Sequence, residues 1–272
     1  MAIRIDTEVP PGIDEFIDNG VVREVLSTIK SGKEATAYLV RGTKKLGAKY
    51  AVAKVYHERN RRNVRDSSVY TQGRVILNGQ VRRAIESKTE AGREFEGAIW
   101  VDHEFEVLSA LEYAGADVPE VYFANENAIL MAHVGDPDGT PAPQLQHLKL
   151  ERDEAEEVLD RLLWNVELWL ANDVVHGDLS AFNILYADGR ATVIDFPQAV
   201  DPRFAPAARN LLERDLANLE RYFGRYGIEF DSSRHAGLLW GRFRYGGSAL
   251  RRGGAPGREG PVTRDPSTAT RR

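Results

Sequence analysis

The stretch HGDLSAFNIL at residues 176–185, followed by VIDFPQ at 193–198, decides both the fold and the chemistry of this chain. Asp178 comes two residues after His176 and five before Asn183, and Asp195 follows the next apolar run. This spacing fits the loop H-x-D-x-x-x-x-N with a later aspartate, an arrangement that serves phosphoryl transfer from ATP. The sequence therefore predicts an ATP-dependent phosphotransferase.

Short apolar runs surround these polar residues and predict small buried strands. The runs are Val174–Val175, Ile184–Tyr186 and Ala191–Ile194, and Asp188–Gly189 is the predicted turn between the last two. A hairpin of this kind would direct Asn183 and Asp195 into one cleft.

The residue types suit the reaction. A hydroxyl that attacks the γ-phosphate needs a proton acceptor, and Asp178 can serve as one. Mg²⁺ prefers oxygen ligands and keeps several waters, so the carboxylate of Asp195 and the amide oxygen of Asn183 suffice once ATP supplies phosphate oxygens. The alternative is that these side chains only satisfy backbone groups in turns. Their joint spacing favours the catalytic interpretation.

A lysine inside a β-type alternation is the candidate for binding the α- and β-phosphates. In YAVAKVY at 50–56, Ala51, Ala53 and Val55 share one face, whereas Val52, Lys54 and Tyr56 share the other. A lysine on the exposed face of a strand is ordinary by itself. Its position before the catalytic loop predicts a functional Lys54.

The partner of Lys54 is expected on a helix. Residues 100–116 carry apolar side chains at helical spacing, with Gly115 as a plausible stop. Glu104 lies at the edge of this apolar stripe and is the preferred partner. Asp102 and Glu106 remain alternatives for the same role.

Two β-rich runs at 25–40 are joined by residues 30–34, a turn whose backbone N–H groups and lysines could cover phosphates. The turn has one glycine, so by itself it is an ordinary hairpin.

Five motifs occur in the order found in RIO-type atypical serine/threonine protein kinases, which the chain resembles from about Phe16 to Ile228. The motifs are IKSGKEATAY, AVAKVY, a W-x-x-x-E helix, HGDLSAFNIL and IDFPQAV. The resemblance identifies a bacterial member of this family. It implies an α+β, two-lobed protein-kinase-like fold of the RIO type, with a mainly antiparallel β N-lobe and a short helical C-lobe without the usual activation segment.

The same resemblance implies roles for individual residues. Lys54 would bind the phosphates with Glu104 as its partner, and Asp178, Lys54 and Asp195 would be catalytic. Asn183 and Asp195 would bind Mg²⁺, with Mn²⁺ as an alternative. The rest of the implied ATP site comprises the phosphate loop Ser31, Gly32, Lys33 and Glu34, and the hinge residues Met131 and His133, whose backbone would contact adenine.

Two positions depart from the family pattern. The usual Ser-Thr before Gly-Lys-Glu-Ala is Lys30-Ser31 here, which keeps one hydroxyl and adds a cation. Pro197 stands where Asp-Phe-Gly would have glycine, and its fixed φ argues against large flips of this segment.

Three segments are expected along the chain. They are an N-terminal lobe at 1–131, a hinge and catalytic lobe at 132–245, and a disordered basic tail at 246–272. An arginine-rich insertion at 57–96 is expected to be a lid or a substrate contact, or simply a solvated loop. Within it, the candidate autophosphorylation sites are Ser67, Ser68 and Thr71.

Composition supports an intracellular enzyme. The 272 residues include no cysteine, which excludes a disulfide scaffold, and no apolar run approaches membrane-spanning length. Cytoplasm is therefore the expected location, without a membrane partner. The net charge is −5, yet the tail is basic, so it either contacts RNA or keeps the enzyme soluble. The family resemblance also suggests a ribosome- or RNA-associated partner.

Two neighbouring features are expected to be structural. His176 should orient the backbone of the catalytic loop, and a helix over 152–170 should pack beneath that loop, with Trp164 and Trp169 in the core.

Three function classes follow from these patterns. The first is a protein kinase that phosphorylates Ser or Thr of a protein substrate or of itself. The second is a small-molecule kinase of the aminoglycoside or choline type, which shares the H-G-D-x-x-x-x-N-I-L loop. The third is an ATPase switch that forms an aspartyl-phosphate, which the family resemblance places on Asp195. The S-G-K-E-A turn and the W-x-x-x-E helix favour the first class over the second.

Overall fold

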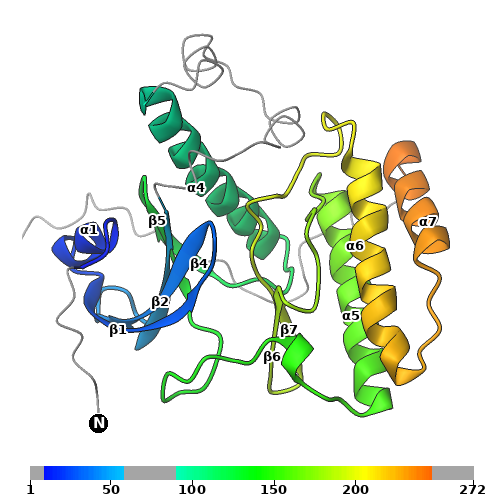
Figure 1. Ribbon diagram of the computed structural model, residues 1–272, viewed down its shortest axis with the longest axis horizontal. Helices are drawn as coiled ribbons and strands as arrows, with labels where there is room; N and C mark the ends of the chain where they lie inside the picture. The colour runs from blue at the N-terminus through cyan, green and yellow to red at the C-terminus, as the bar shows by residue number, and fades with distance from the viewer. Residues whose placement is uncertain (1–8, 58–89, 247–272) are drawn as a thin grey trace, which may run out of the picture.

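The N-terminal lobe is built on an antiparallel sheet, which lies beside α4 in Figure 1. The computed structural model describes residues 9–57 and 90–246. The sheet has the strand order β1-β2-β3-β5-β4. Its strands are β1 (Val22–Ser31), β2 (Ala35–Gly42), β3 (Tyr50–Tyr56), β4 (Val121–Ala124) and β5 (Ala128–Ala132), and helix α1 (Ile13–Asp18) contacts β1.

The central strand β3 separates two hydrophobic clusters. Ala51, Ala53 and Val55 face a small cluster that α1 completes with Ile13 and Phe16. Alternate residues point the other way, where Tyr56 joins the large core that continues into the second lobe. The expected alternation of YAVAKVY is confirmed, and it places Lys54 on the side of the large core and the cavity.

Helix α4 (Glu90–Tyr113) covers the sheet and reaches toward the second lobe (Figure 1). It begins ten residues before the expected start at 100, so the last part of the insertion expected at 57–96 is helical rather than loop. Val101, Leu108 and Leu111 are buried in the large core, as their spacing predicts. Ser67, Ser68 and Thr71 lie outside the described residues.

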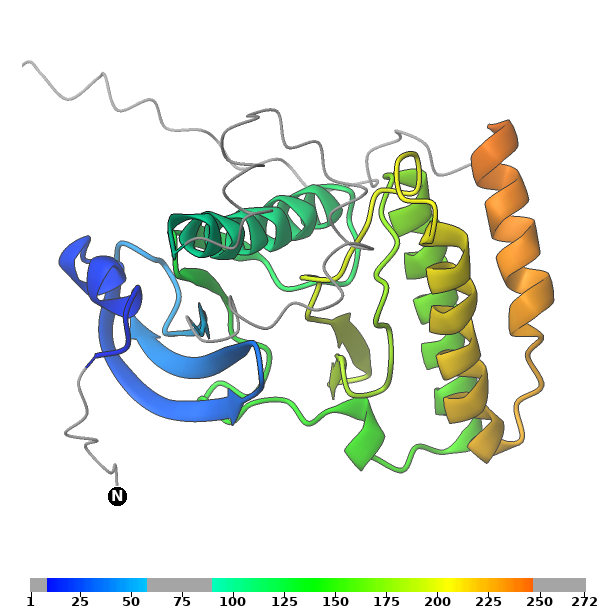
Figure 2. The same ribbon diagram turned by 45° about the horizontal axis from the view of Figure 1, so that its top comes forward.

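Three helices dominate the C-terminal lobe. They are α5 (Arg152–Ala171), α6 (Ala208–Phe223) and α7 (Ser232–Tyr245), with the short 3₁₀ turns η2 (Leu145–His147) and η3 (Gly224–Tyr226). Figures 1 and 2 both show α5 and α6 side by side, with α7 packed outside them. The helix expected at 152–170 is confirmed, and Trp169 is buried in the core as predicted. Trp164 was expected there too, but it is only half-buried, with the Arg161 guanidinium 4.0 Å from its ring centroid.

The hairpin of β6 (Ile184–Ala187) and β7 (Arg190–Val193) carries the two predicted metal ligands at its open end. Its register pairs Ile184 with Val193. Asp188 and Gly189 have φ values of 51° and 73°, which a type I′ turn requires at both central positions. Val174–Val175 was expected to form a strand, but only Val175 pairs, in an isolated bridge with Val200.

The expected α+β, two-lobed kinase-like architecture is confirmed. Residues 133–144 connect the lobes, so the proposed boundary after residue 131 falls one residue before the end of β5. Within residues 9–57 and 90–246, no helix is both long enough and apolar enough to cross a bilayer.

Candidate active site

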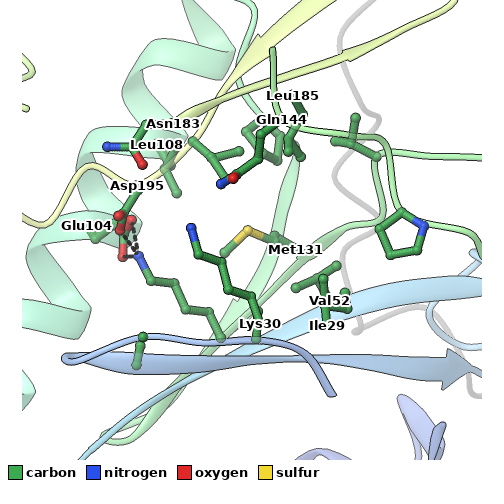
Figure 3. Close-up of a pocket in the computed structure, with 18 of the residues that line it drawn as sticks. Ile29, Lys30, Val52, Glu104, Leu108, Met131, Gln144, Asn183, Leu185 and Asp195 are labelled. Atoms are coloured by element: carbon green, nitrogen blue, oxygen red, sulfur yellow. Dashed lines mark hydrogen bonds and ion pairs between the residues drawn. The ribbon is translucent and has the colours of Figure 1, made fainter. Parts of the chain in front are cut away.

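A cavity of about 570 Å³ lies between the lobes (Figure 3). The β1–β2 turn, β3 and α4 form its wall on the N-terminal side, while the catalytic loop and the β6–β7 hairpin form the opposite wall. The inner end is apolar, with Ile29, Val52, Met131 and Leu185 around it. The other end holds the charged residues.

Lys54 lies at the centre of that charged group. Its Nζ is 2.8 Å from both carboxylate oxygens of Glu104 and 2.6 Å from Oδ1 of Asp195. Dashed lines in Figure 3 mark these contacts. The side chain of Glu104 is buried, whereas Asp102 and Glu106 on the same helix are exposed. The ion pair across the cavity therefore forms with Glu104.

The charge states follow from these contacts. Burial lowers the pKa of Lys54, but Glu104 and Asp195 outweigh it, so the pKa is raised and the ammonium stays charged. Burial raises the pKa of Asp195, yet Lys54 outweighs that effect and the pKa falls below its ordinary value. At neutral pH, Asp195 is therefore a carboxylate that can bind a cation.

The backbone at Asp195 is left-handed, with φ at 73°. Aspartate tolerates this conformation better than most residues. The flanking groups hold the conformation, because Ile194 N–H donates to Asn183 O at 2.9 Å and Phe196 N–H donates to Glu104 Oε1 at 2.8 Å. Glu104 thus contacts both Lys54 and the residue after Asp195.

The ring of Phe196 is fully buried and anchors the backbone next to Asp195 in the core. Its centroid lies 4.4 Å from that of His176 and 5.4 Å from that of Trp169. His176 Nδ1 accepts from Asp178 N–H at 3.2 Å, so Nε2 must carry the proton that bonds to Ile194 O at 3.3 Å. Burial lowers the pKa of His176 to about 4 and keeps this tautomer neutral. The structural role predicted for His176 agrees with these contacts.

Asp178 and Asn183 lie on the C-terminal side of the cavity. Asn183 Nδ2 donates to the backbone oxygen of Asp178 at 3.0 Å and to its Oδ2 at 3.2 Å. The Asp178 side chain is exposed to the cleft, where an incoming hydroxyl could reach it. Burial raises the pKa of Asp178 and the charge of Asp195 adds to this, while Arg214 and Asn183 lower it; the net direction is upward.

A buried carboxylate on α6 holds the catalytic loop, and the sequence analysis missed it. Asp215 Oδ2 accepts from Gly177 N–H at 2.8 Å, and its Oδ1 accepts from Leu179 N–H at 3.0 Å. Asp178 is thus fixed by bonds to the residues on both sides. Burial raises the pKa of Asp215 to about 7, although these two N–H groups lower it. The signal was a charged residue on the apolar stripe of an amphipathic helix, between Leu212 and Leu216.

Gly177 is the residue that this loop geometry requires. Its φ is 81°, and a Cβ there would come within 2.8 Å of Gln198 O. Arg214 also donates to the carbonyl oxygen of Gly177.

The predicted phosphate loop closes β1 and β2 as a tight turn. Gly32 N–H donates to Ala35 O at 2.9 Å, and His57 N–H donates to Glu34 O at 2.8 Å. Ser31 Oγ bonds to Thr36 Oγ1 at 3.0 Å, and that hydroxyl lies 2.7 Å from His57 Nε2. The hydroxyl of Ser31 is therefore held by Thr36, which the sequence analysis did not single out. Of the four predicted phosphate-loop residues, Ser31 is the one that does not line the cavity.

Two members of this loop differ in their charge. Lys33 lines the cavity, as does Glu34. Burial raises the pKa of Glu34, and the nearby charges of Asp195 and Asp178 also raise it, while Lys54 lowers it. The carboxyl group of Glu34 therefore lies near the charged end of the cavity.

The hinge residues Met131 and His133 both line the cavity. Met131 is paired on both sides, with Val52 of β3 and Val121 of β4. Beyond the strand, Val134 O accepts from Ala142 N–H at 2.9 Å. Among the described residues, no loop or turn hydrogen bond between backbone groups uses the N–H of His133 or Val134. Backbone donors for adenine are therefore expected just after β5, and Met131 contributes its side chain.

The two predicted metal ligands fit a hard cation. Asn183 uses its Nδ2 group for Asp178, so its Oδ1 is the atom left to bind a metal, and Asp195 supplies a carboxylate. In the described part of the chain, no three acidic, histidine or cysteine side chains cluster to hold a metal. Such a site depends on phosphate oxygens for its remaining ligands, as expected for Mg²⁺ bound with a nucleotide.

Comparison with known proteins extends these observations. The RIO domain family model matches residues 38–235, most of the chain. The RIO-type serine/threonine-protein kinase Rio2 of Methanocaldococcus jannaschii is 30% identical over 222 residues, covering 80% of this chain and 74% of the relative. Rio1 of Thermoplasma acidophilum is 34% identical over 145 residues, covering 53% of this chain and 74% of the relative. RIO1 of Chaetomium thermophilum is 27% identical, and the match covers 43% of its length.

The fold also has a solved counterpart. The Rio2 kinase of Chaetomium thermophilum, solved as an ADP/Mg²⁺-phosphoaspartate complex, superposes with a TM-score of 0.61 at 21% identity. The match covers 83% of this chain and 64% of that chain, and it shows the common fold. The relatives named here are archaeal and fungal, so bacterial origin stays a prediction. On the evidence of the family model and the kinase-like fold, the chain belongs to the RIO family.

Proposed function

We propose that the chain is an ATP- and Mg²⁺-dependent serine/threonine protein kinase of the RIO type, acting on a protein substrate or on itself. The observation that carries this proposal is the geometry around Lys54. One ammonium contacts Glu104 and Asp195, while Asp178 and Asn183 line the same cavity from the other lobe. Phosphoryl transfer relies on positioning and charge stabilisation, which this arrangement supplies.

The adenine ring would enter the apolar inner end of the cavity. Val52 and Met131 are adjacent there across β3 and β5, and Ile29 closes the slot from β1. The backbone of residues 132–134 would bind the edge of the base. The phosphates would then extend toward Lys54 and the turn at Gly32–Lys33, where the Lys33 ammonium suits an anion, since the N–H of Gly32 is already bonded within the turn.

Asn183 and Asp195 would hold Mg²⁺, which supplies positive charge to the phosphate oxygens when bound. Lys54 would hold the α- and β-phosphates and orient the γ-phosphate. Asp178 would accept the proton of the attacking Ser or Thr hydroxyl, since it is the carboxylate of the loop that faces the cleft. Asp215 would act as a positioning residue, because it fixes the backbone on both sides of Asp178.

One second candidate has a specific observation behind it. The carboxylate of Asp195 is 42% exposed and lies in the cavity, and the matched Rio2 structure is described as a phosphoaspartate complex. An ATPase cycle would have an Asp195 oxygen attack the γ-phosphorus while the bond to ADP breaks, and water would later release phosphate. The family match favours both candidates over a small-molecule phosphotransferase.

Incubation of the purified chain with [γ-³²P]ATP and Mg²⁺ separates the candidates. Acid-stable label on Ser or Thr, of the chain or of an added protein, supports the kinase. Label that hydroxylamine removes, together with free phosphate, supports the ATPase. Absence of label on any protein, with no ATP consumed, would refute both.

The cellular setting is a further part of this proposal. The family and the basic composition of residues 246–272 suggest a partner associated with ribosomes or RNA, and cytoplasm is the expected location. Co-sedimentation of the chain with ribosomal particles at physiological salt tests the partner.

A further inference from the structure

A second lysine enters the cavity through a defect in the β1–β2 pairing. The register pairs Thr28 with Tyr38 and then Lys30 with Ala37, so Ile29 is an extra residue on β1. In a regular strand, consecutive side chains point to opposite faces. Here both Ile29 and Lys30 line the cavity, as β-bulges next to active sites allow.

The bulge places Lys30 in one row with Lys54. Lys30 is opposite Ala37, and Ala37 is opposite Lys54 on the next strand. Two strand spacings separate the backbones of the two lysines, about 10 Å. Ala37 between them has a single methyl group, so it leaves the space above the sheet open. Figure 3 shows the Lys30 side chain extending into the middle of the cavity, toward Gln144.

The two ammonium groups have different surroundings. Lys54 is bound by Glu104 and Asp195. Within the described residues, the Lys30 ammonium makes no hydrogen bond or ion pair; it acts at longer range on Asp195, whose pKa it helps to lower. Three lysines and four carboxylates line the cavity. Because the carboxylates outnumber the lysines, Lys54 alone does not supply enough positive charge to bind an ATP anion.

We propose that Lys30 binds the phosphate chain of the nucleotide and makes the site selective for nucleoside di- and triphosphates over nucleosides. This inference rests on the proposed ATP-dependent function and gives a specific role to Lys30, one of the turn lysines that were expected to cover phosphates and a departure from the family pattern. Lys30 acts from the β1 side of the cavity, and Lys54 acts from the β3 side. The phosphate chain lies between them.

The experiment is a calorimetric titration of the full chain with ATP, ADP, AMP and adenosine at fixed Mg²⁺ and salt. The variants are Lys30→Gln, Lys30→Arg and, as a control, Lys44→Gln. Lys44 is an exposed lysine in the β2–β3 turn, at the far end of β2 from the cavity. Lys44→Gln therefore removes one positive charge, as Lys30→Gln does, but leaves the cavity unchanged.

Lys30→Gln should weaken ATP binding about 10- to 100-fold, the loss expected for a charge-assisted hydrogen bond. Its adenosine affinity should stay within about twofold of the wild type, Lys30→Arg should retain most of the ATP affinity, and Lys44→Gln should match the wild type. The salt dependence of ATP binding should also be shallower in Lys30→Gln.

Equal losses for ATP and adenosine would overturn the proposal, because Lys30 would then only support the shape of the cavity. Unchanged ATP affinity in Lys30→Gln would overturn it as well. Failure of the proposed function is a separate result, since the wild-type chain itself would then bind no ATP.

Discussion

At the scale of single residues, Asp195 combines a left-handed backbone with a carboxylate at 2.6 Å from Lys54. We predict that Asp195→Asn abolishes Mg²⁺-dependent ATP turnover, because the metal loses its charged ligand. Asparagine tolerates positive φ, so this variant avoids the backbone strain that Asp195→Ala would add. Steady-state turnover at saturating Mg²⁺ measures the effect, and thermal melts check that the fold is retained. Near-normal turnover would remove Asp195 from the metal site.

For Asp178 we predict a loss of transfer without a loss of binding. Asp178→Asn should lower phosphoryl transfer to Ser or Thr by about 10²- to 10⁴-fold, the usual cost of removing a general base, with ATP affinity little changed.

The pH dependence of the rate gives an independent check on Asp178. Because the pKa of this carboxyl is raised, the wild-type rate should fall on acidification at a higher pH than an ordinary aspartate would produce. That acid limb should be absent in Asp178→Asn. Wild-type rates in the variant would make Asp178 a purely structural loop residue.

The lowered pKa of the buried His176 should make the free energy of unfolding depend on pH. Its folded pKa is about 4 against an ordinary 6.5, so between these values the unfolded chain binds more protons than the folded one. Its contribution to the free energy of unfolding therefore rises with pH through this window and is lost as pH falls from 6.5 toward 4. Between pH 7 and 5 the loss should be about 2 kcal/mol.

Urea unfolding of the wild type and of His176→Gln at both pH values isolates this contribution. Asp215 has a raised pKa and acts in the opposite direction, but it is present in both proteins and cancels in the difference. Equal pH slopes in the two proteins would contradict the buried neutral imidazole.

At the scale of elements, α4 controls how strongly Lys54 competes for Asp195. Glu104 shares the Lys54 ammonium with Asp195. We predict that Glu104→Gln leaves Lys54 bound to Asp195 alone, so that Mg²⁺ must displace a tighter ion pair. The Mg²⁺ concentration for half-maximal turnover should rise about tenfold, and kcat/KM for ATP should fall.

Glu106→Gln is the matched control for this prediction. Glu106 lies two residues along the same helix with an exposed side chain, so its substitution changes charge and helix propensity equally. If both variants showed the same Mg²⁺ requirement as the wild type, the coupling between α4 and the metal site would be wrong.

The elements also show what the sequence alone can predict. The spacing of Asp178, Asn183 and Asp195 depends on one short loop and hairpin, which local sequence specifies. Lys54 follows from strand alternation, and Glu104 from the helix stripe. Asp215 and Thr36 were missed because their partners are set by tertiary packing: Asp215 bonds to Gly177, 38 residues away, and Thr36 bonds to His57 across 21 residues.

Element boundaries failed for a related reason. The start of α4 at Glu90 lies in a stretch where Ala91, Phe95 and Ala98 recur at helical spacing, but Gly92 and Gly97 lower the helix propensity there and obscure the boundary. The bulge at Thr28–Lys30 could not be read from β1, because a bulge is a property of the pairing with β2. The contribution of Lys30 to the cavity depends on that pairing.

At the scale of the whole molecule, α7 closes the C-terminal lobe, although most of it lies beyond the family match at 38–235. Ala236 and Leu239 are buried in the large core, and Arg242 pairs with Glu167 of α5 at 2.9 Å. We predict that truncation after Asp231 lowers the melting temperature by at least about 5 °C, since it exposes this apolar surface.

Truncation after Gly246 serves as the comparison, because it removes the basic segment and leaves α7 intact. Its melting temperature and ATP turnover should equal those of the full chain. Equal melting temperatures for the two truncations would show that α7 adds nothing to the core.

Strand β3 serves the fold with one face and the chemistry with the other. Ala51, Ala53 and Val55 must fill one cluster while Lys54 faces the cavity. Insertion or deletion of one residue between Tyr50 and Lys54 would move every following side chain to the opposite face of the sheet and turn the ammonium away from the cavity. Insertions and deletions that keep the protein active should therefore occur in the neighbouring turn at 43–49 and be absent from the strand. A catalogue of viable indels from a deep insertion scan would display that boundary directly.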